Sequence, residues 1–171
     1  MTDVIVNKVA ESSLLTINLE EYFPKDEPVL FDLKECLFMG LIVKEKEFRE
    51  TLNKTDTNSF LGKTVLVICS TDAIVPMWAY MLVSARLQPV VKELFYGTKE
   101  EWKKKKLLEA IATIDVSAYR DQRVVVKGCG NDPVPADGYL EITNRLQPVV
   151  KSLMYGEPCS TVPIFKQPKS T

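Results

Sequence analysis

Residues 86–92 read Arg-Leu-Gln-Pro-Val-Val-Lys, and residues 145–151 repeat these seven residues without a change. The register that matches Arg86 with Arg145 extends without gaps on both sides of this motif. Segment 47–97 is identical to segment 106–156 at 17 of 51 positions, whereas unrelated sequences would share about three. We therefore predict that the 171-residue chain contains two copies of one supersecondary unit.

Each copy has the pattern helix, strand, helix, strand. In the first copy, the apolar run 64–68 is typical of a strand buried on both faces, and 90–96 predicts a second strand. The helix between them should end near Gln88, because Pro89 disfavours a helical residue before it. In the second copy the predicted elements are a helix at 99–112 and strands at 123–126 and 149–155.

Strand–helix–strand units of this length imply parallel pairing through right-handed crossovers. We therefore predict a three-layer α/β fold with one mostly parallel sheet. Strand-like runs at 14–19 and 29–33 flank turn residues, which predicts an N-terminal β-hairpin at the sheet edge. The residues after Val162 are expected to be extended and frayed. The predicted single domain, 1–171, comprises a hairpin region (1–45), the two copies (47–97 and 106–156) and a tail (157–171).

The second helix of the first copy is apolar on every face. Residues 77–83 read Met-Trp-Ala-Tyr-Met-Leu-Val, whereas the equivalent residues 136–142 keep a polar side. A helix that is apolar all round must be covered on all sides. Residues 1–45 or a second subunit could supply the cover, and the frequency of two-fold dimers favours the subunit. We predict a homodimer with helix 77–87 at or near its interface.

The composition argues against several classes of function. With 22 basic and 23 acidic residues the net charge is −1, so no strong field attracts nucleic acid or anionic lipid. The chain has no histidine, which removes imidazole bases and histidine-ligated metals. No apolar run approaches the roughly 18 residues of a membrane span, and residues 1–4 do not resemble a signal peptide. We expect a cytoplasmic protein without nucleic-acid or membrane partners.

Three of the four cysteines, Cys69, Cys129 and Cys159, follow predicted strands closely. Parallel sheets bind ligands outside the carboxyl ends of their strands, so we expect the three sulfurs at one sheet edge. Thiolates on separate loops can bind zinc or an iron–sulfur cluster. The carboxylates that could add a further ligand are those of Asp72, Asp132 and Glu157.

Two other interpretations of the cysteines stay open. Predicted helix N-termini after Cys69 and Cys129 favour thiolates, which would permit redox chemistry. A free cysteine also behaves as a small core hydrophobe, and single cysteines without a CxxC spacing form no specific motif. Asp72 and Asp132 are expected to cap helices rather than act as acids.

Several motifs together resemble the DUF2480 family, a bacterial domain of unknown function. They are Phe31-Asp32-Leu33-Lys34 and the stretches 41–49, 69–76, 126–130 and 156–163. The resemblance covers nearly the whole chain and implies no activity, substrate or cofactor. Genes of this family often lie near those for iron–sulfur cluster assembly, so the resemblance implies assembly proteins as partners.

Two functions follow from these observations. The first is an accessory protein that binds a metal or sulfur species through Cys69, Cys129 and Cys159, with a link to iron–sulfur cluster assembly. The alternative is a non-catalytic structural or protein-interaction module whose cysteines are buried. Whether the chain is an enzyme stays open, since its carboxylates and Lys127 form no identifiable acid–base pair.

Overall fold

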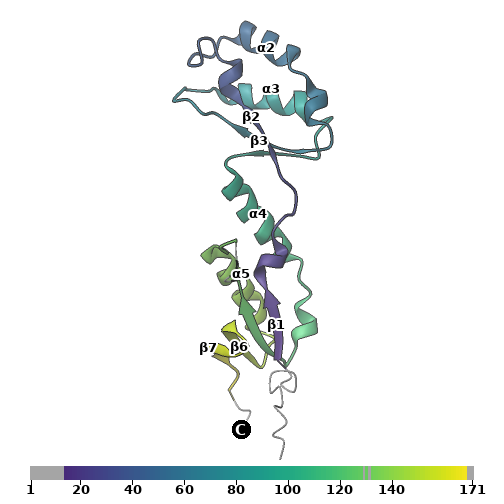
Figure 1. Ribbon diagram of the computed structural model, residues 1–171, viewed down its shortest axis with the longest axis vertical. Coiled ribbons are helices and arrows are strands. Elements are labelled where there is room, and N and C mark those ends of the chain that lie inside the picture. Colours follow the sequence, from purple (N-terminus) through teal and green to yellow (C-terminus); the bar gives the residue numbers. More distant parts are fainter. Residues whose placement is uncertain (1–13, 129, 131, 169–171) are drawn as a thin grey trace, which may run out of the picture. The chain divides into compact units, whose positions relative to one another are not determined.

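The structure is a computed structural model that describes residues 14–128, 130 and 132–168 (Figure 1). The chain divides into two compact units, each with its own sheet and hydrophobic core. We name them for their place in the sequence. The central unit comprises residues 25–102, and the terminal unit combines the described residues before 25 with those after 102.

The central unit contains a parallel sheet of three strands in the order β2–β3–β4. Val65 and Val67 of β3 share one buried core with Phe48 of helix α2 and Val83 of helix α3. Both helices therefore pack on the same face of the sheet. The elements are β2 (Val29–Asp32), η2 (Leu33–Cys36), α2 (Glu45–Lys54), η3 (Thr57–Phe60), β3 (Thr64–Ile68), α3 (Met77–Leu87) and β4 (Glu93–Tyr96).

The terminal unit contains four strands in the order β1–β5–β6–β7, of which only β7 is antiparallel to its neighbour. Val124 and Val126 of β5 share a core with Leu107 of helix α4 and Ile142 of helix α5. Helix α4 begins in the central unit and continues into the terminal unit after Trp102. The elements are β1 (Leu14–Asn18), η1 (Leu19–Tyr22), α4 (Lys99–Ala112), η4 (Val116–Tyr119), β5 (Arg123–Lys127), α5 (Ala136–Leu146), β6 (Ser152–Glu157) and β7 (Ser160–Lys166).

Elements of the two units begin at positions that the repeat makes equivalent, as in η3 and η4, β3 and β5, α3 and α5, and β4 and β6. Their turns correspond as well. Gly62 and Asp121 both have a positive φ, and their N–H groups donate to the carbonyl oxygens of Val90 and Val149 at 2.8 and 2.9 Å. The parallel pairing predicted for strands 64–68 and 90–96 is confirmed, because β3 and β4 are parallel neighbours.

Two predictions about the sheet are wrong. The strands form two sheets instead of one, since β3 and β5 lie in different sheets. The N-terminal hairpin does not form, because β1 pairs in parallel with β5 and β2 pairs in parallel with β3. A strand buried on both faces has no water to bond its backbone groups, so it needs a hydrogen-bonding neighbour along each edge. Strand β1 is the second neighbour of β5, and β2 is the second neighbour of β3. The three-layer arrangement and the single domain stay predictions.

The expected frayed tail is also wrong for residues 163–166, because β7 includes them. Pro163 lies opposite Met154, beside a bulge between Leu153 and Met154. Proline is tolerated in an edge strand at such a position because it has no N–H to donate to the ladder. The end of the predicted tail, residues 169–171, lies outside the described residues.

Candidate functional site

The structure does not bring the predicted cysteine ligands to one sheet edge. Cys69 directly follows β3 in the central unit, whereas Cys159 lies between β6 and β7 in the terminal unit. Cys129 lies outside the described residues. The single-edge prediction is wrong because it required both repeats to share one sheet. In the described part of the chain, no group of three Cys, Asp or Glu side chains is arranged to hold a metal ion.

The three carboxylates proposed as additional ligands are exposed, and two of them form ion pairs. Asp132 lies 3.0 Å from Lys103, and Glu157 lies 3.2 Å from Lys127. The capping roles expected for Asp72 and Asp132 are wrong. Pro76 and Pro135 occupy the N-cap positions of α3 and α5, where no side chain makes a capping hydrogen bond.

The cysteine with the clearest structural role is Cys36, which was not among the predicted site residues. Cys36 ends η2 and lies buried in the core of the central unit. Burial and the nearby charge of Glu35 raise the pKa of its thiol to about 11, so it is protonated at neutral pH. Cys69 is half-buried, and its thiol donates to the carbonyl oxygen of Thr71 at 3.5 Å. These contacts fit cysteines that act as small core residues.

A pair of tyrosines occupies corresponding positions in the two units. The rings of Tyr80 on α3 and Tyr96 on β4 meet edge to face, with centroids 5.1 Å apart. Tyr139 on α5 and Tyr155 on β6 repeat this arrangement at 5.5 Å. This geometry is favourable because the positive ring edge meets the negative ring face. Each pair therefore joins a crossover helix to the strand that follows it.

The hydroxyl of Tyr80 is not suited to acid–base chemistry. Partial burial, a hydrogen bond with Tyr96 and the neighbouring Cys69 raise the pKa of Tyr80 to about 12. At neutral pH the hydroxyl therefore keeps its proton and acts as a hydrogen-bonding group. The pairs were visible in the sequence as identities at 80/139 and 96/155, but identity alone did not show that each pair is in contact.

An open depression lies beside each tyrosine pair, and the two depressions differ in size. The one in the central unit has a volume of about 290 Å³ and is lined by Met77, Tyr80 and Tyr96. The one in the terminal unit measures about 130 Å³, and Ile164 of β7 forms part of its wall. The remaining lining residues there are Val126, Tyr139, Thr143, Leu153, Met154 and Tyr155.

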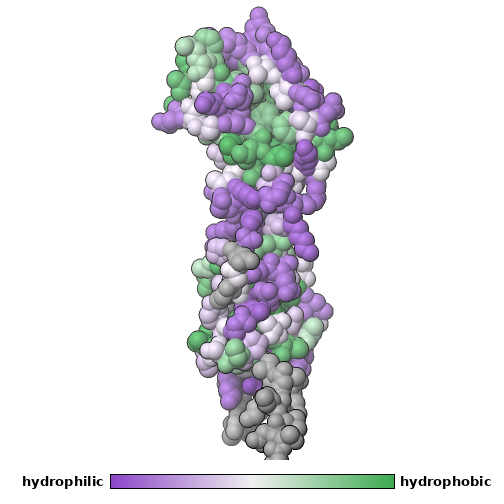
Figure 2. All heavy atoms as spheres, in the orientation of Figure 1, coloured by the Kyte–Doolittle hydropathy of each residue, from purple (hydrophilic) through white to green (hydrophobic). Residues whose placement is uncertain are grey.

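Helix α3 was predicted to be covered by residues 1–45 or by a second subunit, and within the described chain part of it is exposed. Trp78 packs edge-on against Phe48 of α2, with ring centroids 5.7 Å apart. Contact with α2 therefore explains why this side of α3 is apolar. Met77 and Met81 lie one helical turn apart and are 71% and 70% exposed. Tyr96 is 65% exposed. We call the group formed by Met77, Tyr80, Met81 and Tyr96 the α3 surface. Figure 2 shows apolar residues gathered on the drawn face of the central unit.

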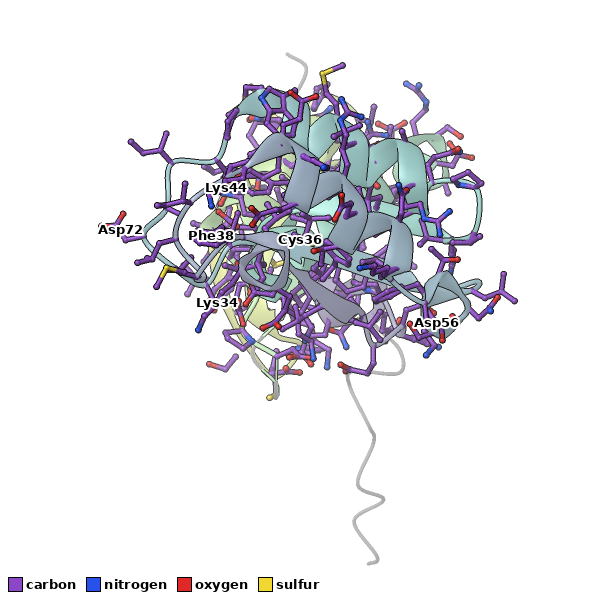
Figure 3. The ribbon with its side chains drawn as sticks, turned by 90° about the horizontal axis from the view of Figure 1, so that it is seen from above. Lys34, Cys36, Phe38, Lys44, Asp56 and Asp72 are labelled. Carbon is purple, nitrogen blue, oxygen red and sulfur yellow. The ribbon has the colours of Figure 1, made fainter. Side chains whose placement is uncertain are left out.

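A second exposed apolar stretch in the central unit is the turn between η2 and α2. Phe38 and Ile42 form a β-bridge, and the side chains of Met39, Leu41 and Ile42 are exposed. The ammonium group of Lys44 lies 3.1 Å from the centroid of the Phe38 ring. This cation–π contact links the two ends of the turn. Figure 3 shows Phe38 and Lys44 on one side of the unit and Asp56 on the opposite side.

Mostly parallel sheets with crossover helices, together with an exposed apolar surface, define an α/β protein with a candidate binding surface. The chain belongs to the DUF2480 family of proteins of unknown function, whose model matches residues 3–167. The family resemblance is thus confirmed. No curated protein and no solved structure matches the chain. Among the helices of the described residues, none is long and apolar enough to cross a membrane.

Proposed function

We propose that this protein is a cytoplasmic, non-catalytic interaction module that binds a partner polypeptide through the α3 surface. The observation that carries the proposal is a difference between equivalent positions. Met77 begins α3 and is largely exposed, whereas Ala136 begins α5. Ile74, which is 95% exposed, likewise corresponds to Pro133. Because the terminal unit forms the same elements without large apolar residues there, folding does not require them, and exposed apolar clusters mark binding sites.

The chemistry of the α3 surface supports binding rather than catalysis. Thioether side chains supply no proton donor or acceptor of useful strength, and they adapt to varied partner shapes. Tyr80, with a pKa of about 12, keeps its proton at neutral pH. Tyr96 offers an amphipathic ring with a polar tip, which is a side chain enriched at protein interfaces. The α3 surface therefore has the features of a recognition surface.

Metal or sulfur binding through Cys69, Cys129 and Cys159, with a link to iron–sulfur cluster assembly, stays a prediction from the sequence. No contact of the described cysteines favours it, because Cys69 bonds to Thr71 and Cys159 belongs to the other unit. Elemental analysis of protein purified without air or chelator tests it. Stoichiometric zinc or iron that is lost in a Cys69→Ser variant would support the metal function over the interaction function.

We also infer that the two units derive from duplication of one ancestral unit. The gapless register between the copies, the matching element starts and the two tyrosine pairs support this inference. In this view β7 is specific to the terminal unit and Met77 is specific to the central unit. Met81 corresponds to Leu140, which is 66% exposed. The predicted homodimer would use the same surface, so a second copy is one partner that the experiment must identify.

Site-specific photocrosslinking in the cells that make the protein tests the proposed function. A photoreactive phenylalanine analogue replaces Met77 in one variant and Ala136 in the matched control. Both positions are exposed and begin equivalent helices. A discrete adduct from position 77 that is absent from position 136 supports the proposal, and its mass identifies a partner or a second copy. The absence of a discrete adduct at position 77 would contradict it.

A further inference from the structure

The two sheets differ at one edge. In the terminal unit, β7 pairs antiparallel with β6 along the side that faces away from β5. Strand β4 is the counterpart of β6, since the two begin at equivalent positions of the repeat and each follows a crossover helix. Among residues 14–128, 130 and 132–168, no strand pairs with the side of β4 that faces away from β3. Within the described part of the chain, the central unit thus leaves open the edge that β7 covers in the terminal unit.

The backbone pattern identifies the groups on this open edge. The N–H of Gly97 donates to the carbonyl oxygen of Val67 on β3, at 3.2 Å. Peptide groups alternate in direction along a strand, so the backbone groups of Leu94 and Tyr96 face away from β3. Their equivalents in β6 are Leu153 and Tyr155, which lie opposite Phe165 and Val162 of β7. Leu94 and Tyr96 therefore present the groups by which β6 binds β7.

Strand β7 also shows which side chains such an edge accepts. Ile164 helps line the depression beside Tyr139 and Tyr155, and Phe165 packs against the core of the terminal unit. The depression beside Tyr80 and Tyr96 has about twice the volume, 290 against 130 Å³. Tyr96 is 65% exposed, whereas Tyr155 is 37% exposed. Both depressions therefore adjoin a tyrosine pair. Met77 completes the lining in the central unit, whereas Ile164 of β7 forms part of the wall in the terminal unit.

We propose that the outer edge of β4 binds an extended segment of a partner protein as an added antiparallel strand. A branched aliphatic or aromatic side chain of that segment occupies the depression beside Tyr80 and Tyr96. In this mode of recognition, main-chain hydrogen bonds supply affinity and side-chain sites supply specificity. The inference rests on the proposed function, because it names the chemistry of the partner that the α3 surface binds.

A synthetic peptide with the sequence of β7, residues 160–166, is the probe, since β7 occupies the equivalent edge. Amide hydrogen exchange in the full chain is followed by NMR as peptide is added. We expect exchange at Leu94 and Tyr96 to slow by at least about tenfold near saturation, because their amides become hydrogen-bonded. The matched control is a peptide in which the residues equivalent to Ile164 and Phe165 are serine, and it should slow exchange far less.

Two variants separate the backbone of the edge from its side chain. Tyr96→Pro removes the outward N–H, whereas Tyr96→Ala keeps it and removes only the ring. Peptide binding should fall at least about tenfold further in Tyr96→Pro than in Tyr96→Ala. Equal binding by the two variants would overturn strand addition.

Circular dichroism and thermal unfolding show whether both variants remain folded. If Tyr96→Pro does not fold, a peptide N-methylated at the residues equivalent to Val162 and Phe165 replaces it, and undiminished binding of that peptide would overturn strand addition.

The remaining outcomes distinguish this inference from the proposed function. Unchanged exchange at Leu94 and Tyr96 with about 1 mM peptide overturns strand addition. In that case a photocrosslink at position 77 still supports the interaction module, and its absence removes both proposals. Protection that appears without peptide and rises with protein concentration assigns the edge to a second copy. That result would overturn the partner-protein assignment.

Discussion

The ring of Tyr80 meets the ring of Tyr96 edge to face at the end of β4, with ring centroids 5.1 Å apart. One residue comes from the crossover helix and the other from the strand that it leads to. The contact therefore joins α3 to β4, the outer strand of the three-stranded sheet. The same relationship between Tyr139 and Tyr155 makes the terminal unit an internal control for experiments on the central unit.

A Tyr80→Phe variant should lose the hydroxyl contact and keep the ring packing. We expect the free energy of unfolding at pH 7 to fall by about 1 kcal/mol, the usual net value of one hydrogen bond. The raised pKa of Tyr80 adds a pH dependence. Its contribution to stability is fully present below the unfolded value of 10.0 and is lost as pH rises to about 12.

Denaturant unfolding between pH 9 and 12 checks this prediction. The wild-type protein should lose stability more steeply than Tyr80→Phe over that interval, because only the wild type has this proton to release. Comparison of the two proteins cancels the titration of lysines, which both share. Parallel stability curves would show that the Tyr80 hydroxyl is not specifically stabilised in the folded state.

A Met77→Ala variant should leave folding stability nearly unchanged, because the side chain is 71% exposed. We expect the free energy of unfolding to change by no more than about 0.5 kcal/mol. Phe48→Ala is the matched core variant, since Phe48 is fully buried against Trp78 in the same unit. It should cost about 3–5 kcal/mol. A large loss for Met77→Ala would mean that this methionine serves folding, which would weaken the proposed function.

Two glycines with positive φ should respond differently to alanine. A Cβ at Gly156 would lie 2.6 Å from the backbone oxygen of Ser160, whereas a Cβ at Gly62 meets nothing within 4 Å. Gly62→Ala should therefore cost only the conformational penalty, about 1 kcal/mol. Gly156→Ala should cost more, because the turn between β6 and β7 must also shift. Urea unfolding of both variants compares them, and equal losses would show that this turn yields without cost.

The described cysteines should differ in their reaction with iodoacetamide at pH 7.5. Cys159 is exposed and should be alkylated in the native protein. Cys36 is buried, and its thiol has a pKa raised to about 11, so it should react only after denaturation. Mass spectrometry of peptides from native and denatured samples measures both. Alkylation of Cys36 at a rate near that of Cys159 would contradict its placement in the core.

Local elements were well predicted from the sequence because their signals are local. The apolar run 64–68 and the predicted helix 99–112 match β3 and α4 at both ends. Strand β7 was missed because Pro163 lowers the strand signal, and only its position opposite Met154 makes the proline acceptable. The partners of β1 and β2 were also missed, because periodicity shows that a residue run is a strand and not what it pairs with.

The candidate site depended more on tertiary structure. Met77, Tyr80 and Tyr96 could be read from the sequence, but Tyr96 lies on a different element from the other two. Packing of α3 on the sheet brings these three residues around one depression. The predicted cysteine site at one sheet edge was wrong because Cys69 and Cys159 adjoin strands of two different sheets. Cys36 gave no signal, since its burial depends on the folding of η2 onto the core.

The sequence by itself determined the family, the two repeats and the helices and strands within each. Periodicity, proline positions and internal identity can all be read from the order of residues along the chain. Only the tertiary structure decided that β3 and β5 belong to separate sheets and that, within the described residues, β6 has an outer partner whereas β4 has none. The physical reason is that strand pairing depends on which distant segments bury each other's apolar faces and bond each other's backbone. The two repeats can therefore share a sequence pattern and still differ in which strand pairs with the outer edge of their sheets.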